Sequence, residues 1–129
     1  MERLTVETFE ELKKSTLECV DKLKEFTPGH YYDDCGDQWG TVKGCSLHLK
    51  SGYDDERFIE VRACTDDETD DISFEVYEII NCNSYIETEN FNEFYKFVEE
   101  NFIDILNDIE LELSNSTGYP VEYEWSVTE

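Results

Sequence analysis

The sequence predicts a single α+β domain over residues 1–129, in which two amphipathic helices pack on one face of an antiparallel sheet of three to five strands. Apolar residues recur at helical spacing in two segments, 8–26 and the segment that follows residue 90, whereas they alternate with polar residues in between. The alternation gives one apolar and one polar face, which is typical of an antiparallel sheet covered on a single side. No internal repeat or linker divides the chain.

The first helix is predicted over residues 8–26. Thr8 and Glu11 match a capping box, and apolar side chains follow at helical spacing. Pro28 ends the helix, because proline lacks the backbone N–H that a further turn requires. The next segment, 30–39, mixes aromatic residues with aspartates and has no clear period, so it is predicted to be a loop.

Three strands are predicted next, because apolar and polar residues alternate along each of them. Short polar segments rich in aspartate connect the strands, so they are expected to form a meander. The third strand either ends at residue 76 or is lengthened by the run through Tyr77, Ile79 and Ile80. The predicted strands are 45–49, 59–63 and 72–76, and the connecting turns are 51–55 and 66–71.

A second helix is predicted from Asn90, which forms a cap-like pair with Glu93, and it carries the strongest apolar stripe in the chain. From residue 109 onward the apolar residues alternate with glutamates. Residues 109–113 therefore fit either the last turns of this helix or a strand that pairs with 121–125 in a C-terminal hairpin. The pattern leaves both alternatives open.

The cysteines and the N-terminal residues indicate the compartment. Five cysteines without a C-x-x-C motif suit reduced, mostly buried thiols better than a disulfide framework. The N-terminal residues lack a basic stretch followed by an apolar one, and no apolar run is long enough to span a bilayer. We therefore expect a cytoplasmic protein.

Charge is the property that most restricts the choice of partner. The chain has 33 acidic and 10 basic residues, which give a net charge of -23. Residues 63–129 contain 19 of the acids and a single base, Lys96. This negative field repels phosphate backbones and anionic lipids, so we expect neither direct nucleic-acid binding nor membrane binding. The expected partner is a basic protein surface, and the oligomeric state stays open.

Two segments contain metal-ligand residue types. His30, Cys35, Cys45 and His48 offer the sulfur and imidazole ligands that zinc prefers, but Cys45 and His48 fall on opposite faces of a predicted strand. The acidic loop 66–71 lacks the glycine and the bidentate glutamate of a calcium-binding loop. We therefore predict no metal site. Zinc binding by His30, Cys35, Cys45 and His48 is the alternative.

No sequence motif indicates catalysis. The chain has two histidines and contains no nucleophile elbow, phosphate-binding glycine loop or zinc-protease motif. Paired carboxylates are so frequent in this sequence that they identify no catalytic pair. The chain is therefore predicted not to be an enzyme and to need no cofactor.

The candidate partner-binding residues are acidic side chains in three segments. In the alternative with a C-terminal hairpin, Glu110, Glu112, Glu122 and Glu124 share its outward face. Tyr31, Tyr32 and Trp39 provide either an aromatic anchor for the partner or lids over the core. The acidic candidates are Asp66, Asp67, Glu68, Asp70, Asp71, Glu99, Glu100, Asp104, Asp108, Glu110, Glu112, Glu122 and Glu124.

In size, acidity and absence of catalytic motifs, the sequence resembles the small acidic phage proteins that inhibit restriction or CRISPR nucleases by imitating nucleic acid. It also resembles immunity proteins that neutralise basic nuclease toxins. The first resemblance implies an anti-restriction or anti-CRISPR type of inhibitor that occupies the nucleic-acid-binding surface of an enzyme. The alternatives are an immunity protein and a zinc-stabilised or structural adaptor module of unknown role.

Overall fold

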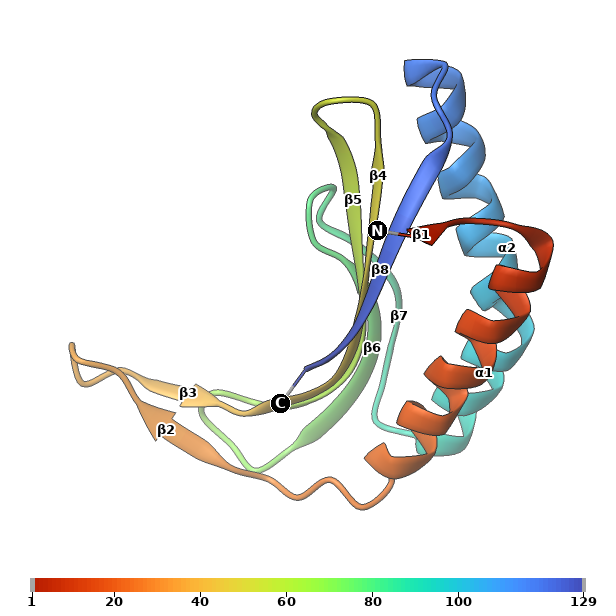
Figure 1. The fold of residues 1–129 in the computed structure, drawn as a ribbon. Coiled ribbons are helices and arrows are strands. Elements are labelled where there is room, and N and C mark those ends of the chain that lie inside the picture. The colour runs from red at the N-terminus through yellow and green to blue at the C-terminus, as the bar shows by residue number, and fades with distance from the viewer. Residues whose placement is uncertain (1, 129) are drawn as a thin grey trace.

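A six-stranded antiparallel sheet and two helices form the body of the protein in the computed structural model, which describes residues 2–128 (Figure 1). The elements are β1 (Glu2–Arg3), α1 (Val6–Leu23), β2 (His30–Tyr32), β3 (Gln38–Gly40), β4 (Val42–Ser51), β5 (Asp55–Thr65), β6 (Ile72–Glu78), β7 (Asn83–Thr88), α2 (Phe91–Thr117) and β8 (Val121–Thr128). The strands of the sheet lie in the order β1-β8-β4-β5-β6-β7. Both helices cover the same face, and the β2–β3 hairpin projects away from them (Figure 1). The α+β class is confirmed, and the sheet has more strands than predicted.

The first helix begins earlier than the capping box suggested. The N-cap is Thr5, whose side-chain oxygen accepts a hydrogen bond from the Thr8 backbone N–H at 3.1 Å. Thr8 itself is buried in the first turn, where its hydroxyl donates to the Arg3 carbonyl at 3.3 Å. The helix ends at Leu23, before Pro28 is reached.

The predicted meander is present as β4, β5 and β6, and alternate residues of each strand face the helices. The third strand extends beyond residue 76, as its apolar residues allowed, but β6 ends at Glu78 and does not reach Ile80. Ile79 and Ile80 lie in the following turn, with 40% and 47% of their surface exposed. The chain then returns as β7, which pairs antiparallel with β6 and was not predicted.

The second helix resolves the alternatives for residues 109–113. Its N-cap is Asn90, as predicted, and it continues to Thr117, where Gly118 adopts a left-handed φ of 73° that suits a C-cap. Ile109 and Leu113 are buried on the core side, one helical turn apart. Residues 121–125 belong to β8, which pairs with β4 and β1 rather than in a C-terminal hairpin. Neither α1 nor α2 combines the length and apolar composition needed to cross a bilayer.

One carboxylate is buried at the end of the core. Glu78 is fully buried on β6 and accepts hydrogen bonds from Arg57 Nε and Nη2, from the Tyr85 hydroxyl at 2.8 Å and from Asn81 Nδ2 at 3.0 Å. Burial alone would raise the pKa of Glu78, but the hydrogen bonds and the charge of Arg57 bring it below its ordinary value. The Arg57–Glu78 pair therefore joins β5 to β6 where both strands leave the apolar core.

Removing one partner of this pair leaves the other charge buried. We expect Arg57→Ala to lower the free energy of unfolding by about 3 to 5 kcal/mol, measured by urea denaturation. The double variant Arg57→Met with Glu78→Leu, which removes both charges, is expected to lose less than Arg57→Ala alone. If the double variant were the less stable of the two, the desolvated charge would not be the cause.

The Arg57–Glu78 pair predicts that the free energy of unfolding depends on pH. Because the pKa of Glu78 is lowered from 4.5 in the folded state, its ionised form stabilises the fold above that pH. This stabilisation is lost as the pH falls through the folded-state pKa. We expect Glu78→Gln to be less stable than the wild type at neutral pH and the difference to narrow in acid, measured by urea unfolding from about pH 7 to about pH 3. A difference independent of pH would contradict this assignment.

Candidate protein-binding surfaces

The segment 30–39, predicted to be a loop, contains the antiparallel hairpin β2–β3. Asp33 organises its turn, because one carboxylate oxygen accepts the backbone N–H groups of Cys35 and Asp37, each at 2.9 Å. The other oxygen accepts the Trp39 indole N–H at 2.8 Å. These bonds, that from Trp39 above all, lower the pKa of Asp33. Hydrogen bonds accepted by one carboxylate therefore stabilise the turn of this hairpin. Hydrophobic periodicity carries no signal of such bonds, so it did not predict the hairpin.

The hairpin packs against the acidic loop 66–71. His30 Nε2 donates to the carbonyl oxygens of Asp66 at 2.9 Å and Thr69 at 2.8 Å. The Gly40 backbone N–H donates to a carboxylate oxygen of Asp67 at 2.9 Å. Because both segments are held together by these bonds, we treat residues 30–40 and 66–71 as one unit, the acidic lobe.

The acidic lobe carries both exposed aromatic rings and carboxylates. Tyr31, Tyr32 and Trp39 are 54%, 69% and 43% exposed, so the alternative that they are lids over the core is wrong. Tyr31 and Trp39 are paired in register and therefore share one face of the hairpin. Among the described residues, no Lys or Arg forms an ion pair with any acid of the lobe. These acids are Asp33, Asp34, Asp37, Asp66, Asp67, Glu68, Asp70 and Asp71.

A second acidic surface follows the outer side of α2. Glu100, Asp104 and Asp108 are exposed and succeed one another at intervals of four residues, about 6 Å apart along the helix axis. Like charges at this interval destabilise a helix. Lys96 lies 4.0 Å from Glu100 and provides the nearby positive charge. We call Glu99, Glu100, Asp104 and Asp108 the α2 ridge, and all four are candidates predicted from the sequence.

The four remaining candidates do not share a surface. Glu110 and Glu112 lie in α2, where Glu112 accepts a hydrogen bond from Arg57 Nη1 at 2.6 Å. Glu110 is partly buried, which raises its pKa. The alternative in which Glu110, Glu112, Glu122 and Glu124 share the outward face of a C-terminal hairpin is therefore wrong. The first two of these residues are helical.

Glu122 and Glu124 lie on β8, on the sheet face that points away from the helices. They are directly opposite Lys50 and His48 of β4. A positive side chain thus faces Glu122, and an imidazole ring faces Glu124. These two glutamates therefore each have a basic residue type directly opposite them, whereas only Lys96 lies near the α2 ridge and no Lys or Arg pairs with the acidic lobe in the described residues.

The four predicted zinc ligands are separated by the fold. His30 and Cys35 belong to the hairpin, and Cys45 is buried under the sheet. His48 lies on the opposite sheet face, stacked on the Phe58 ring at 4.1 Å between centroids. In residues 2–128, no group of three or more His, Cys, Asp or Glu side chains is placed to hold a metal ion. The fold therefore does not support the zinc-binding alternative.

Sequence reasoning did not select Asp33, Asp34 and Asp37 as surface candidates. All three lie on the acidic lobe because the hairpin folds back on itself. Aspartate two and three residues before Gly36 is a turn signal that indicates such a reversal.

Comparisons of the chain with protein-family models, with curated proteins and with solved structures found no match. The function is therefore inferred from these surfaces alone.

The position of Gly40 allows a test of the lobe. A Cβ atom on Gly40 would lie 1.8 Å from the Thr65 carbonyl oxygen, so Gly40→Ala must move the hairpin away from β5 and the loop. We expect amide exchange of Thr41 and Asp66 to accelerate at least about ten-fold, which corresponds to about 1.4 kcal/mol of lost local stability. Hydrogen exchange followed by NMR measures this change.

The matched control is Gly36→Asn, at the tip of the hairpin. Gly36 has a φ of 84°, which asparagine tolerates better than most residues, and no atom lies within 4 Å of an added Cβ. We expect this variant to leave exchange at Thr41 and Asp66 nearly unchanged. If Gly40→Ala left it unchanged as well, the hairpin would not be held on the loop.

Proposed function

We propose that this protein is a stoichiometric inhibitor or decoy that binds the basic nucleic-acid-binding surface of an enzyme. The observation that supports the proposal is the pair of exposed carboxylate surfaces, the acidic lobe and the α2 ridge, which have almost no cationic neighbours. Such an inhibitor requires no chemistry of its own. It acts by occupying the site that phosphate groups would fill.

The arrangement of charge on α2 supports imitation of a phosphate backbone. Carboxylates four residues apart on a helix are separated by about 6 Å along the axis. Phosphates of one DNA strand follow one another every 3.4 Å of axis, so every second phosphate lies about 6.8 Å further along the duplex axis. The α2 ridge therefore offers negative charges at nearly the interval of alternate phosphates.

The acidic lobe adds a preference for arginine. The exposed rings of Tyr31 and Trp39 provide flat surfaces on which a guanidinium group can stack. Asp37, Asp67 and Glu68 line the same shallow pocket as Trp39, and their carboxylates can accept the N–H groups of that guanidinium. An arginine in a nucleic-acid groove would thus find both an aromatic face and an anion, and buried aromatic and arginine residues contribute most to interface affinity.

Long-range attraction is expected to dominate the kinetics of binding. A net charge of -23 attracts a basic surface before contact and raises the association rate. This attraction is screened by salt, with a Debye length of about 8 Å at physiological ionic strength. Association of the proposed complex should therefore slow markedly as salt is added.

Capture of the partner with tagged protein, followed by competition with duplex DNA or RNA, tests the proposal. We expect the captured protein to be a nucleic-acid-binding enzyme that the nucleic acid displaces and that an equimolar amount of this protein inhibits. A captured nuclease whose activity survives saturating amounts of this protein would refute the inhibitor function. The identity of the captured enzyme also distinguishes a restriction or CRISPR nuclease from a nuclease toxin, the target of an immunity protein.

Charge reversal separates binding from stability. Asp104→Lys removes repulsion within the α2 ridge, so we expect it to stabilise the helix by about 0.5 kcal/mol. Combined with Glu68→Lys in the acidic lobe, it should weaken inhibition of the captured enzyme at least about ten-fold. Inhibition titrations and urea denaturation measure the two effects.

The matched control carries Glu10→Lys and Glu25→Lys, which change the net charge equally at exposed positions outside both surfaces. Its inhibition should stay close to that of the wild type. Equal weakening in both double variants would attribute binding to net charge alone, and it would remove the two surfaces from the proposal.

A further inference from the structure

Within residues 2–128, half of one edge of β8 has no neighbouring strand. β4 pairs with β8 from Val121 to Thr128, whereas β1 pairs only with Glu122 and Tyr123 on the other side. The Leu4 backbone N–H donates to the Val121 carbonyl at 3.2 Å on that side. Because backbone groups of a strand alternate between its two edges, those of Trp125 and Val127 point in the same direction as those of Val121.

These backbone groups are available for pairing. In the part of the chain that the structure describes, no strand covers Trp125 or Val127, and the Val127 side chain is 55% exposed. Proteins commonly protect such edges with lysine, proline or a bulge. The segment 125–128 contains neither residue, and its register with β4 is regular. It is therefore a short strand edge on which a further strand can pair.

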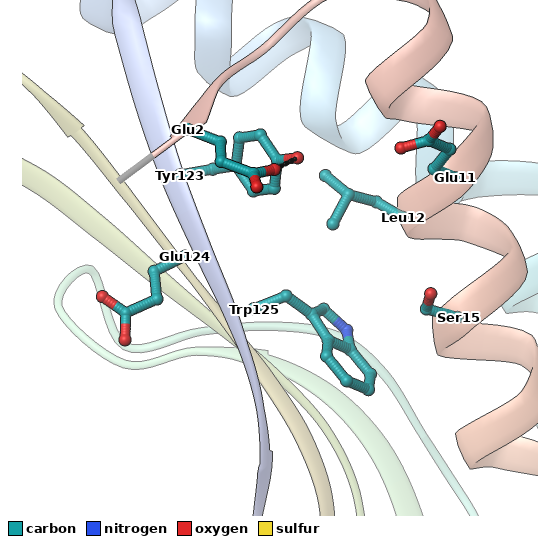
Figure 2. A pocket seen from close by; sticks show the side chains of 7 residues that line it. All are labelled: Glu2, Glu11, Leu12, Ser15, Tyr123, Glu124 and Trp125. Carbon is teal, nitrogen blue, oxygen red and sulfur yellow. Dashed lines mark hydrogen bonds between the residues drawn. The ribbon is translucent and has the colours of Figure 1, made fainter.

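A first cavity lies between this edge and α1. It has a volume of about 410 Å³, and Figure 2 shows Glu11, Leu12 and Ser15 of α1 facing Trp125 of β8 across it. Glu2 lies at its β1 end, where the carboxylate accepts a hydrogen bond from the Tyr123 hydroxyl at 2.5 Å. Three glutamates, Glu2, Glu11 and Glu124, therefore line this space, which we call the Glu11 cavity.

A second cavity continues the first along the same edge. It has a volume of about 220 Å³ and shares Ser15 and Trp125 with the Glu11 cavity. Leu23, Cys19 and Val127 form its apolar wall, and we call it the Cys19 cavity. Its charged lining consists of two lysines, Lys22 and Lys43, and one glutamate, Glu18, so positive side chains outnumber negative ones there.

We propose that an extended segment of a protein partner adds to the open edge of β8 as an antiparallel strand, with an apolar side chain in the Cys19 cavity and a basic side chain in the Glu11 cavity. Such strand addition derives affinity from main-chain hydrogen bonds and specificity from pockets for alternate side chains. The site is separate from the acidic lobe and the α2 ridge, and it does not depend on the function proposed for them.

The geometry of a strand explains the choice of side chains. Residues of an added strand that lie opposite Val127 and Trp125 point toward α1, and they are two positions apart, about 6.8 Å. The two cavities follow one another along the edge, so each receives one of these side chains. The carboxylates of Glu2 and Glu11 favour a cation in one cavity, and Lys22 and Lys43 disfavour a cation in the other.

The charge of the protein argues against a second copy as the occupant. Two copies that pair through their β8 edges would each carry a net charge of -23 and would repel each other. A partner segment with a basic residue is attracted by the same field. The antiparallel direction follows β1, which already pairs with β8 in that way.

The probe is the acetylated and amidated pentapeptide Glu-Thr-Leu-Thr-Arg, which in the antiparallel direction places leucine opposite Val127 and arginine opposite Trp125. We expect a Kd of about 1 mM or tighter, with NMR shifts at the backbone amides of Trp125 and Val127. A control peptide with leucine and arginine exchanged should bind at least about ten-fold more weakly.

The rate of Cys19 alkylation gives a second measure of peptide binding in the Cys19 cavity. Its pKa is lowered to about 7, chiefly by a hydrogen bond with Cys45 and to a smaller extent by Lys22 and Lys43, so its thiolate predominates at mildly alkaline pH. Alkylation of Cys19 by iodoacetamide should slow about ten-fold at a peptide concentration of about ten times Kd. Alkylation of two exposed cysteines on other surfaces should not change: Cys35 and Cys82.

Val127→Pro tests the backbone pairing. Proline at this position removes an N–H that points away from β4, so the β4–β8 pairing is retained while peptide binding is expected to weaken at least about ten-fold. Val127→Ala keeps the N–H and serves as the matched control. Glu11→Lys, an exposed change on α1, should weaken the arginine peptide even if the proline variant folds poorly.

Three results would overturn the proposal. The first is the absence of shifts at Trp125 and Val127 with either peptide at about 1 mM. The second is equal binding of the peptide by Val127→Pro and Val127→Ala. The third is self-association of the wild type that Val127→Pro abolishes, because it would assign the edge to a second copy. Asp104→Lys should bind the peptide as the wild type does, so failure of one proposal leaves the other standing.

Discussion

The burial of one face of the sheet under α1 and α2 is the constraint on which the rest of the structure depends. Alternate residues of β4, β5, β6 and β8 form the core with the two helices, and among the described residues the core includes a single buried carboxylate, Glu78. Every other acid must lie outside this layer, because an ion without a partner is costly to bury. The fold can therefore accept a large negative charge only at its margins, on the outer face of its sheet and on the outer sides of its helices.

The few basic residues are distributed unevenly, and this decides which acidic surfaces remain uncompensated. On the sheet face away from the helices, Arg62 bonds to Glu60 and Glu75, while Lys50 and His48 lie opposite the glutamates of β8. Arg57 binds Glu78 and reaches α2. The acidic lobe and the α2 ridge receive little of this positive charge, so their carboxylates are the ones available to a cationic partner.

The brevity of β1 gives the molecule a different kind of surface. A two-residue strand covers only part of the β8 edge and leaves the segment beside Trp125 open toward α1. The acidic surfaces lack shape selectivity of this kind, because they offer charge on exposed side chains. The β8 edge instead combines directional backbone groups with two cavities whose charged linings differ, and the proposed strand addition would use both to discriminate among peptide sequences.

The sequence by itself determined the features that depend on neighbouring residues. The α+β class, the meander of β4, β5 and β6 and the Asn90 cap follow from periods of two and 3.6 residues and from local capping chemistry. Tertiary contacts decided the rest. Residues 109–113 are helical because Ile109 and Leu113 are buried against the sheet, and β8 pairs with β4 and β1, which are distant in sequence. The hairpin at 30–39 packs on a loop about thirty residues away, and the same folding separates the four candidate zinc ligands. Local patterns carry no information on such distant pairings, so the acids of one segment could be predicted as exposed, but their grouping into surfaces could not.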